Sequence, residues 1–205
     1  MKHFSDLTPA ASRVLDVAER LIARRGYNGF SYEDIARQIG IRKPSIHHHF
    51  ATKAELVAVL AQRYTHRFRS ALLEIDGRHG QASARLRAYA ALFEQTYRRD
   101  GELCVCGILG AEAESLPTPA ADEVARFFRV NLDWLTATFA AGAEAGELRL
   151  PRPAAAHAQA CLALLEGAMV VGRGLGTGGT ASAALTPAAL AAAYLVPLAS
   201  APAAA

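Results

Sequence analysis

The stretch that decides the fold is residues 31–53, SYEDIARQIGIRKPSIHHHFATK. Ser31 is a favourable residue to precede a helix, and Asp34 stands three positions later, where a capping box places an acid. Gly40 supplies the left-handed conformation that ends a helix. Pro44 is tolerated in the first turn of a second short helix. The stretch therefore predicts a helix-turn-helix, whose second helix enters the major groove of DNA.

The side chains of the predicted second helix have the chemistry that DNA requires. Ile41, Ile46 and Phe50 are expected to be buried, and the other residues of 41–53 include many donors and no carboxylate. Such donors contact phosphates and base edges. The candidates for DNA binding are Arg42, Lys43, Ser45, His47, His48, His49 and Lys53. An ordinary helical hairpin with a solvated basic face is the alternative interpretation.

Charge is distributed unequally along the chain. Residues 1–70 hold 12 Lys/Arg and 6 Asp/Glu, a balance of +6, whereas residues 71–205 hold 10 and 13, a balance of −3. A basic segment attached to a mildly acidic one is what a DNA-binding head on a regulatory body requires. We therefore expect a head at residues 1–54 and a body at 55–205, although solvated charged faces alone could produce the same division.

The composition favours an all-α protein of about nine helices. The chain has 205 residues, 52% of them hydrophobic, is rich in Ala and Leu, and shows no alternating pattern of strands. A glycine-rich linker is expected at 172–184, and the tail at 200–205 is expected to fray. Helices are predicted at about 8–25, 31–40, 42–50, 53–76, 82–99, 103–115, 120–145, from 154 onward, and 187–198.

Several other classes of protein are not indicated. Apolar stretches of about 18 residues are interrupted by charges or helix breakers, so we expect no membrane span. Three cysteines do not form a disulfide framework, and the default compartment is a reducing cytoplasm. The consecutive histidines 47–49 point about 100° apart on a helix and do not converge on one metal ion. With no catalytic or phosphate-loop motif, neither an enzyme nor a cofactor is predicted, so a small helical enzyme is the least favoured alternative.

Residues Ala11 to Leu60 resemble the DNA-binding domain of TetR-family transcriptional regulators. The resemblance rests on Arg25-Gly26-Tyr27 at the end of a first helix, on SYEDIARQIGI, on His49-Phe50 and on Lys53. The sequence departs from the family pattern at His47, where the family usually has Tyr, and at Arg42, where a small polar residue is common. The resemblance implies a TetR-like all-α fold that binds a double-stranded operator and a small-molecule effector.

The last two predicted helices, at about 154–198, have little polar surface to present to water. A monomer would expose a large apolar patch there, so we expect a homodimer. The TetR resemblance implies the same interface, and a two-fold dimer requires a near-palindromic operator. The alternative is that both helices belong to the internal core.

Two cysteines near the start of a predicted helix, Cys104 and Cys106, are candidates for a sensor. A helix N-terminus and the nearby Arg98-Arg99 would stabilise a thiolate, which reacts with electrophiles or oxidants. Residues 104–117, CVCGILGAEAESLP, are also similar to TetR regulators of the N-ethylmaleimide-reductase repressor type, and the resemblance favours Cys104. The alternative is that both are small buried residues.

Aromatic side chains of the body, above all Phe93, Tyr97 and Trp134, are candidates to line an effector pocket, or are simply core. Taken together, the sequence predicts a homodimeric transcriptional regulator, a repressor that a small molecule, an electrophile or an oxidant releases from DNA. A helical architectural protein that binds DNA without sequence preference is the alternative.

Overall fold

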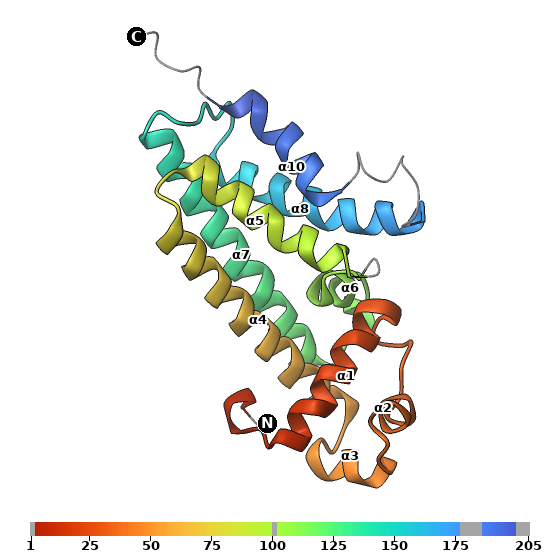
Figure 1. Ribbon diagram of the computed structural model, residues 1–205. Coiled ribbons are helices and arrows are strands. Elements are labelled where there is room, and N and C mark those ends of the chain that lie inside the picture. The colour runs from red at the N-terminus through yellow and green to blue at the C-terminus, as the bar shows by residue number, and fades with distance from the viewer. Residues whose placement is uncertain (1–2, 100–101, 177–185, 200–205) are drawn as a thin grey trace. The chain divides into compact units, whose positions relative to one another are not determined.

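The computed structural model describes residues 3–99, 102–176 and 186–199, and these residues form an all-α fold (Figure 1). Nine α-helices and three short 3-10 turns account for the regular structure of the described residues, together with one isolated bridge between Leu148 and Ala199. The helices are α1 (Pro9–Arg25), α2 (Tyr32–Ile39), α3 (Lys43–His49), α4 (Lys53–Arg78), α5 (Ala82–Tyr97), α6 (Val105–Ala111), α7 (Thr118–Glu144), α8 (Ala154–Gly174) and α10 (Pro187–Leu195). The all-α prediction is confirmed.

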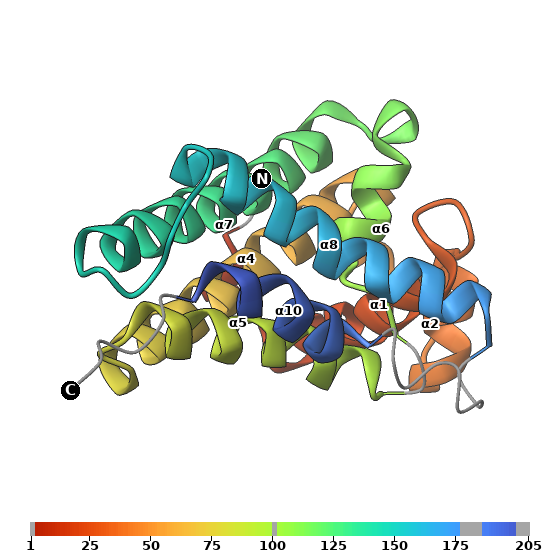
Figure 2. The same cartoon turned by 90° about the horizontal axis from the view of Figure 1, so that it is seen from above.

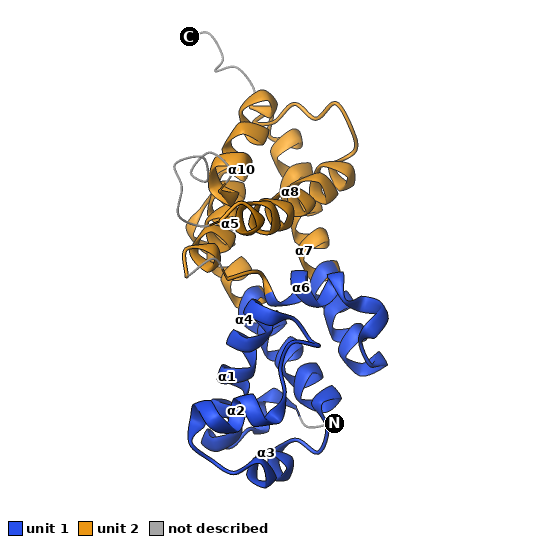
Figure 3. Cartoon of the chain, turned by 90° about the vertical axis from the view of Figure 1, so that its right-hand side faces the viewer, with its two compact units in different colours: residues 1–68, 105–128 blue, residues 69–104, 129–205 orange. Residues whose placement is uncertain are grey.

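The chain divides into two compact units, which Figure 3 colours separately. Unit 1 comprises residues 1–68 and 105–128, and unit 2 comprises residues 69–104 and 129–205. The long helices α4 and α7 contribute residues to both units. Because α6 and the start of α7 group with the first 68 residues, unit 1 is larger than the head expected at residues 1–54, and that functional division stays a prediction.

Unit 1 is built on helix ends that the sequence predicts. The Thr8 side chain accepts a hydrogen bond from the amide of Ala11 and caps α1, and Gly26 ends that helix at φ +74°. Ser31 and Asp34 form both hydrogen bonds of a capping box at the start of α2. Gly40 ends α2 in the left-handed conformation. The core beneath these ends consists of fully buried apolar side chains, among them Leu15, Ile22, Ile35, Ile46, Phe50 and Leu56.

Unit 2 is a helical body in which α10 lies along α5 and α8 (Figure 2). Thr186 caps α10 by accepting a hydrogen bond from the amide of Ala189, and Pro187 occupies its first turn. The side chains of Tyr89, Phe93 and Phe139 are among the largest that are fully buried. By length and composition alone α8 could also cross a membrane, a test that the core helix of a soluble protein passes equally.

Three predicted helix boundaries were wrong. The helix predicted at 103–115 is shorter, because the chain leaves helical geometry at Glu112 (φ −103°, ψ 19°) before the 3-10 turn Ala113–Ser115. The break expected at 116–119 is narrower, because Pro119 falls in the first turn of α7, where proline is tolerated. Helix α8 continues to Gly174, into the stretch predicted as a linker. The rest of that stretch, from 177, and the tail from 200 lie outside the described residues.

Candidate DNA-binding and sensing sites

The pair α2 and α3 is held together by buried apolar side chains and one buried hydrogen bond. Ile35 of α2 and Ile46 of α3 are fully buried, as is Phe50 just after α3. The hydroxyl of Tyr32 donates to the carbonyl oxygen of Phe50 at 3.0 Å, which ties the start of α2 to the end of α3. Ile41 is half-buried rather than buried, as an apolar turn residue between the two helices. The core therefore fixes which face of α3 turns outward.

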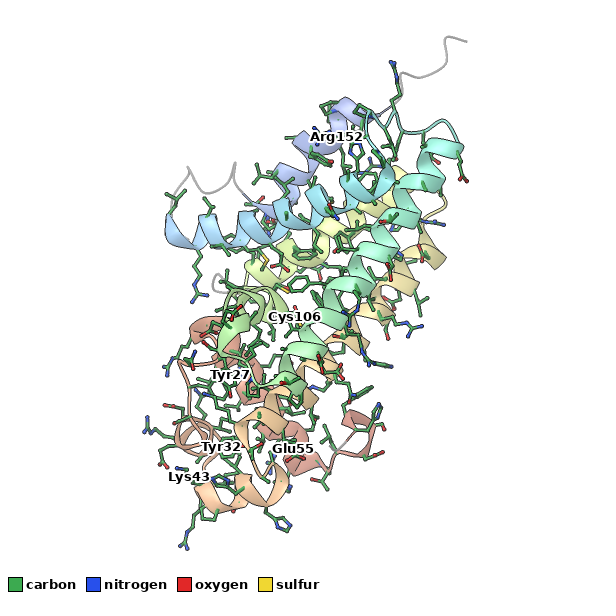
Figure 4. All side chains as sticks on the ribbon, turned by 180° about the vertical axis from the view of Figure 1, so that it is seen from behind. Tyr27, Tyr32, Lys43, Glu55, Cys106 and Arg152 are labelled. Atoms are coloured by element: carbon green, nitrogen blue, oxygen red, sulfur yellow. The ribbon has the colours of Figure 1, made fainter. Side chains whose placement is uncertain are left out.

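That outward face carries most of the candidate DNA contacts. Five of the seven candidates are exposed and sit on α3 or immediately before it: Arg42, Lys43, Ser45, His47 and His48. His49 is half-buried, and its ring packs against that of His48 with centroids 5.7 Å apart. In Figure 4, Lys43 and the α6 residue Cys106 lie toward opposite ends of unit 1, with Tyr27 between them. The exposed donors thus form one basic surface at one end of the unit.

His47 is oriented by two neighbours. Its Nδ1 lies 3.2 Å from the carbonyl oxygen of Ala51, and its ring meets Tyr32 edge-on at 4.7 Å. Because a carbonyl only accepts, Nδ1 carries the hydrogen in this contact, and Nε2 is the ring nitrogen left for DNA. An imidazole held in this way presents a defined acceptor in its neutral form.

Lys53 differs from the other candidates because it has partners inside unit 1. Its Nζ donates to the carbonyl oxygen of Phe30 at 2.6 Å and lies over the rings of Phe30 and Tyr27, at 4.2 and 4.6 Å from their centroids. Burial lowers the pKa of Lys53, while Glu112 and Asp34 act in the opposite direction. This ammonium group joins the start of α4 to the segment between α1 and α2.

Glu112 is a functional candidate that the sequence reasoning missed. Its carboxylate accepts hydrogen bonds from the backbone amide of Tyr27, and from both the backbone and side-chain amides of Asn28 at 3.3 and 3.2 Å. A Cβ on Gly26 would collide with Glu112 Oε2, so glycine is required by this close approach as well as by its positive φ. Glu112, just after α6, is thus hydrogen-bonded to the residues that follow α1, and all of them lie within unit 1.

The two sensor candidates are both buried and fall in different units. Cys104 is 2% exposed and ends the segment of unit 2 just before α6, whereas Cys106 is fully buried on α6 in unit 1. The guanidinium of Arg98, expected near Cys104, instead forms an ion pair with Glu94 at 2.8 Å. The thiol of Cys104 donates a hydrogen bond to the carboxyl group of Glu166 on α8. Cys104 therefore has an acidic neighbour, and its expected stabilisation by Arg98-Arg99 stays a prediction.

The three aromatic candidates lie in unit 2, and Tyr89 connects two of them. The Tyr89 ring stacks on Trp134 with centroids 5.3 Å apart and packs against Phe93 at the same distance. Trp134 donates from Nε1 to the carboxylate of Asp76 at 2.9 Å. Tyr97 has a buried hydroxyl without a hydrogen-bond partner among the described residues, packed close to Gly172. Two of the three are therefore parts of a packed aromatic cluster.

The buried hydroxyl of Tyr89 extends this cluster to a set of polar side chains. Tyr89 donates to Asn131 Oδ1 at 2.8 Å, and burial raises the pKa of Tyr89 well above its ordinary value, with smaller contributions from Cys161, Glu166 and Cys104. Glu166 is the residue that sequence reasoning missed here. The signal was present, because Glu166 is the single carboxylate in the predominantly apolar sequence of α8.

Comparisons with known proteins agree with this architecture. Residues 14–60 match the family model described as bacterial regulatory proteins, tetR family. A TetR-family transcriptional regulator from Agrobacterium tumefaciens is 34% identical, with a TM-score of 0.85 over 93% of this chain and 97% of that chain. A TetR regulator from Legionella pneumophila is 26% identical over 83% of this chain and 90% of its own, with a TM-score of 0.75.

The reduced form of NemR from E. coli has the same fold. It is 20% identical, with a TM-score of 0.79 over 96% of this chain and all of that chain. At this identity the similarity concerns the fold alone. None of the curated proteins matches the chain.

Proposed function

The chain belongs to the TetR family of DNA-binding transcriptional regulators, and from this premise we propose that it is a cytoplasmic, homodimeric repressor. Its operator is a near-palindromic duplex, and a small molecule or a cysteine-modifying electrophile or oxidant releases it. The observation that carries the proposal is the basic outward face of α3, in which Arg42, Lys43, Ser45, His47 and His48 are exposed on a helix fixed by a buried core.

The contacts proposed for α3 follow from the positions of its side chains. Lys43 and Ser45 lie in the first turn of the helix, the part of a recognition helix that reaches base edges. Arg42 precedes the helix and carries a guanidinium suited to a phosphate or a guanine. His49 and Lys53 are proposed for the phosphate backbone, with Lys53 also holding the turn through Phe30.

The proposed dimer interface is the outer face of α8 and α10. Val170 and Val171 on α8 are 57% and 53% exposed, and Leu175 just after the helix is 64% exposed. Val196, which follows α10, is 71% exposed. Exposed apolar side chains on adjacent helices are typical of an interface between subunits. A two-fold axis at this surface would present two copies of α3 to one duplex.

Release from DNA is proposed to pass through α6. Glu112 follows α6 and holds the amides of Tyr27 and Asn28, which lead into α2. A ligand or a modified cysteine that favours another position of α6 would therefore favour another position of the α1–α2 turn. Such a ligand needs only different affinities for the two conformations.

Operator selection from a random duplex pool with the purified full-length protein tests this function. We expect a near-palindromic consensus, a high ratio of specific to non-specific affinity, and a steep dependence on salt. Lys43→Ala should weaken operator binding about tenfold without lowering thermal stability, since one phosphate or base contact is worth about 1–3 kcal/mol. Arg78→Ala, at an exposed site at the end of α4 in unit 2, is the control. Equal affinity for all sequences would instead support the architectural protein.

A further inference from the structure

Glu166 occupies an unusual position for a carboxyl group. It is the single acidic residue of α8, and its Oε1 is buried without a hydrogen-bond partner among the described residues. A buried polar atom that lacks a partner costs about 1–3 kcal/mol, more when charged, so its presence calls for an explanation. The stability of unit 2 would be served better by an apolar residue here.

The partner that the carboxyl group does have is the thiol of Cys104, which donates a hydrogen bond to it. Both groups belong to unit 2, and Cys104 is 2% exposed. Cys161, Glu166 and Cys104 all act on the Tyr89 hydroxyl of α5, so these titratable groups lie close to one another. From α7 the neighbour is the uncharged Asn131, held by Tyr89. Among the described residues, no cation contributes to the pKa shift of Glu166.

We propose that Cys104 and Glu166 share one proton, and that Glu166 thereby makes Cys104 the reactive cysteine among the three of this chain. Glu166 is the positioning residue of the pair, and the thiol sulfur of Cys104 is the nucleophile. This inference rests on the proposed response to electrophiles. It also agrees with the sequence resemblance, which favours Cys104 over Cys106.

The ionisation of the Cys104–Glu166 pair explains why Cys104 is the cysteine that reacts. Burial raises the pKa of Glu166 to about 7, and the hydrogen bond from Cys104 acts in the opposite direction. The carboxyl group therefore loses its proton near neutral pH, and the carboxylate that forms can accept the thiol proton of Cys104 as the sulfur attacks. Cys161 contrasts with this, because burial raises the pKa of its thiol to about 12 and leaves it neutral.

The addition of an electrophile balances without an oxidant. With N-ethylmaleimide, the Cys104 sulfur forms a bond to one alkene carbon, and the π electrons move to the neighbouring carbon. The thiol proton passes to the Glu166 carboxylate and then to that neighbouring carbon. The product is a thioether, and the carboxylate is restored.

Site-resolved labelling of the full-length protein with N-ethylmaleimide tests the pair. The rate at each cysteine is measured by peptide mass spectrometry between pH 6 and 9. We expect the Cys104 rate to rise with a midpoint near pH 7 and to exceed those of Cys106 and Cys161. Glu166→Gln should lower the Cys104 rate at pH 7.5 about tenfold and move the rise to higher pH, where an isolated thiol ionises.

Two internal controls keep the result unambiguous. Local opening of the buried segment that carries Cys104 affects labelling of the wild type and the variant alike. A loosened fold in Glu166→Gln would instead increase the labelling of Cys161 in the same sample. The wild-type profile alone is decisive if the variant does not fold, since a midpoint at pH 8.5 or above would refute the shared proton. If the folded Glu166→Gln variant shows the same pH dependence of Cys104 labelling as the wild type, the shared proton is refuted as well.

Operator binding measured on the same samples separates this inference from the function on which it rests. Labelled Cys104 with unchanged operator affinity would contradict the proposed release but leave the pair intact. Release by N-ethylmaleimide with Cys106 labelled in place of Cys104 would support the release and refute the pair.

Discussion

The carboxylate of Glu112 accepts a hydrogen bond from the backbone amide of Tyr27, 85 residues earlier in the chain. Two further hydrogen bonds from Asn28 end on the same carboxylate. A side chain at the end of the segment that carries Cys106 thus holds the segment that leads into the helix-turn-helix. Within unit 1 these contacts form a covalent and hydrogen-bonded path between the helix that carries Cys106 and the segment that leads into α2.

Glu112→Gln should lower the free energy of unfolding by about 1–2 kcal/mol, because hydrogen bonds to a charged acceptor are replaced by weaker ones to a neutral amide. Urea denaturation measures the loss, and hydrogen exchange at the Tyr27 and Asn28 amides should become faster. Glu114→Gln, at an exposed residue of the following 3-10 turn, is the matched control and should change neither.

Gly26→Ala should be more destabilising than Gly40→Ala, although both glycines have positive φ, +74° and +76°. The Cβ at residue 40 meets nothing within 4 Å, so its cost is the left-handed backbone alone, about 1–2 kcal/mol. Gly26 combines its φ with a ψ of −175°, which favours glycine strongly, and its Cβ would collide with the Glu112 carboxylate. We expect a loss of about 2–3 kcal/mol there. Equal losses in urea denaturation would show that the close approach is unimportant.

Val170→Glu should convert the proposed dimer to monomers, because each interface would bury two carboxylates without partners. Size-exclusion chromatography with light scattering gives the mass, and operator affinity should fall with dimer formation. Leu73→Glu is the matched control: Leu73 is 65% exposed on α4, away from α8 and α10 in sequence, and the variant should stay dimeric. A Val170→Glu protein that remains a dimer would place the interface elsewhere.

The stability of the wild-type protein should depend on pH through Glu166. Its pKa is raised by burial to about 7 in the folded chain, so the folded state binds the proton more tightly than the unfolded state. This contribution is fully present below about pH 4.5 and is lost as the pH rises through 7. Glu166→Gln removes this pH-dependent contribution to stability. The variant should therefore gain melting temperature relative to wild type between pH 5.5 and 8, and parallel curves would contradict the buried carboxylate.

Local features of the chain were predictable wherever neighbouring residues fix the backbone. The capping box of Ser31 and Asp34, the glycine end of α2 and Pro44 in the first turn of α3 are all present, and together with the family resemblance they specify the head. Helix boundaries were harder to predict where the chain near a helix end binds a group that is distant in sequence. The helix that carries Cys106 ends earlier than its composition suggests, where the chain turns at Glu112 and its side chain binds the amides after α1.

The sequence by itself determined the all-α class, the helix-turn-helix and the basic character of α3, because periodicity, capping and charge are properties of neighbours in the chain. Its resemblance to TetR-family regulators indicated the family. Only the tertiary structure decided which long-range groups meet. It assigned Lys53 to Phe30, Glu112 to Tyr27 and Glu166 to Cys104, since packing brings together side chains that lie far apart in sequence. Burial then set the ionisation of Glu166, which composition could not reveal.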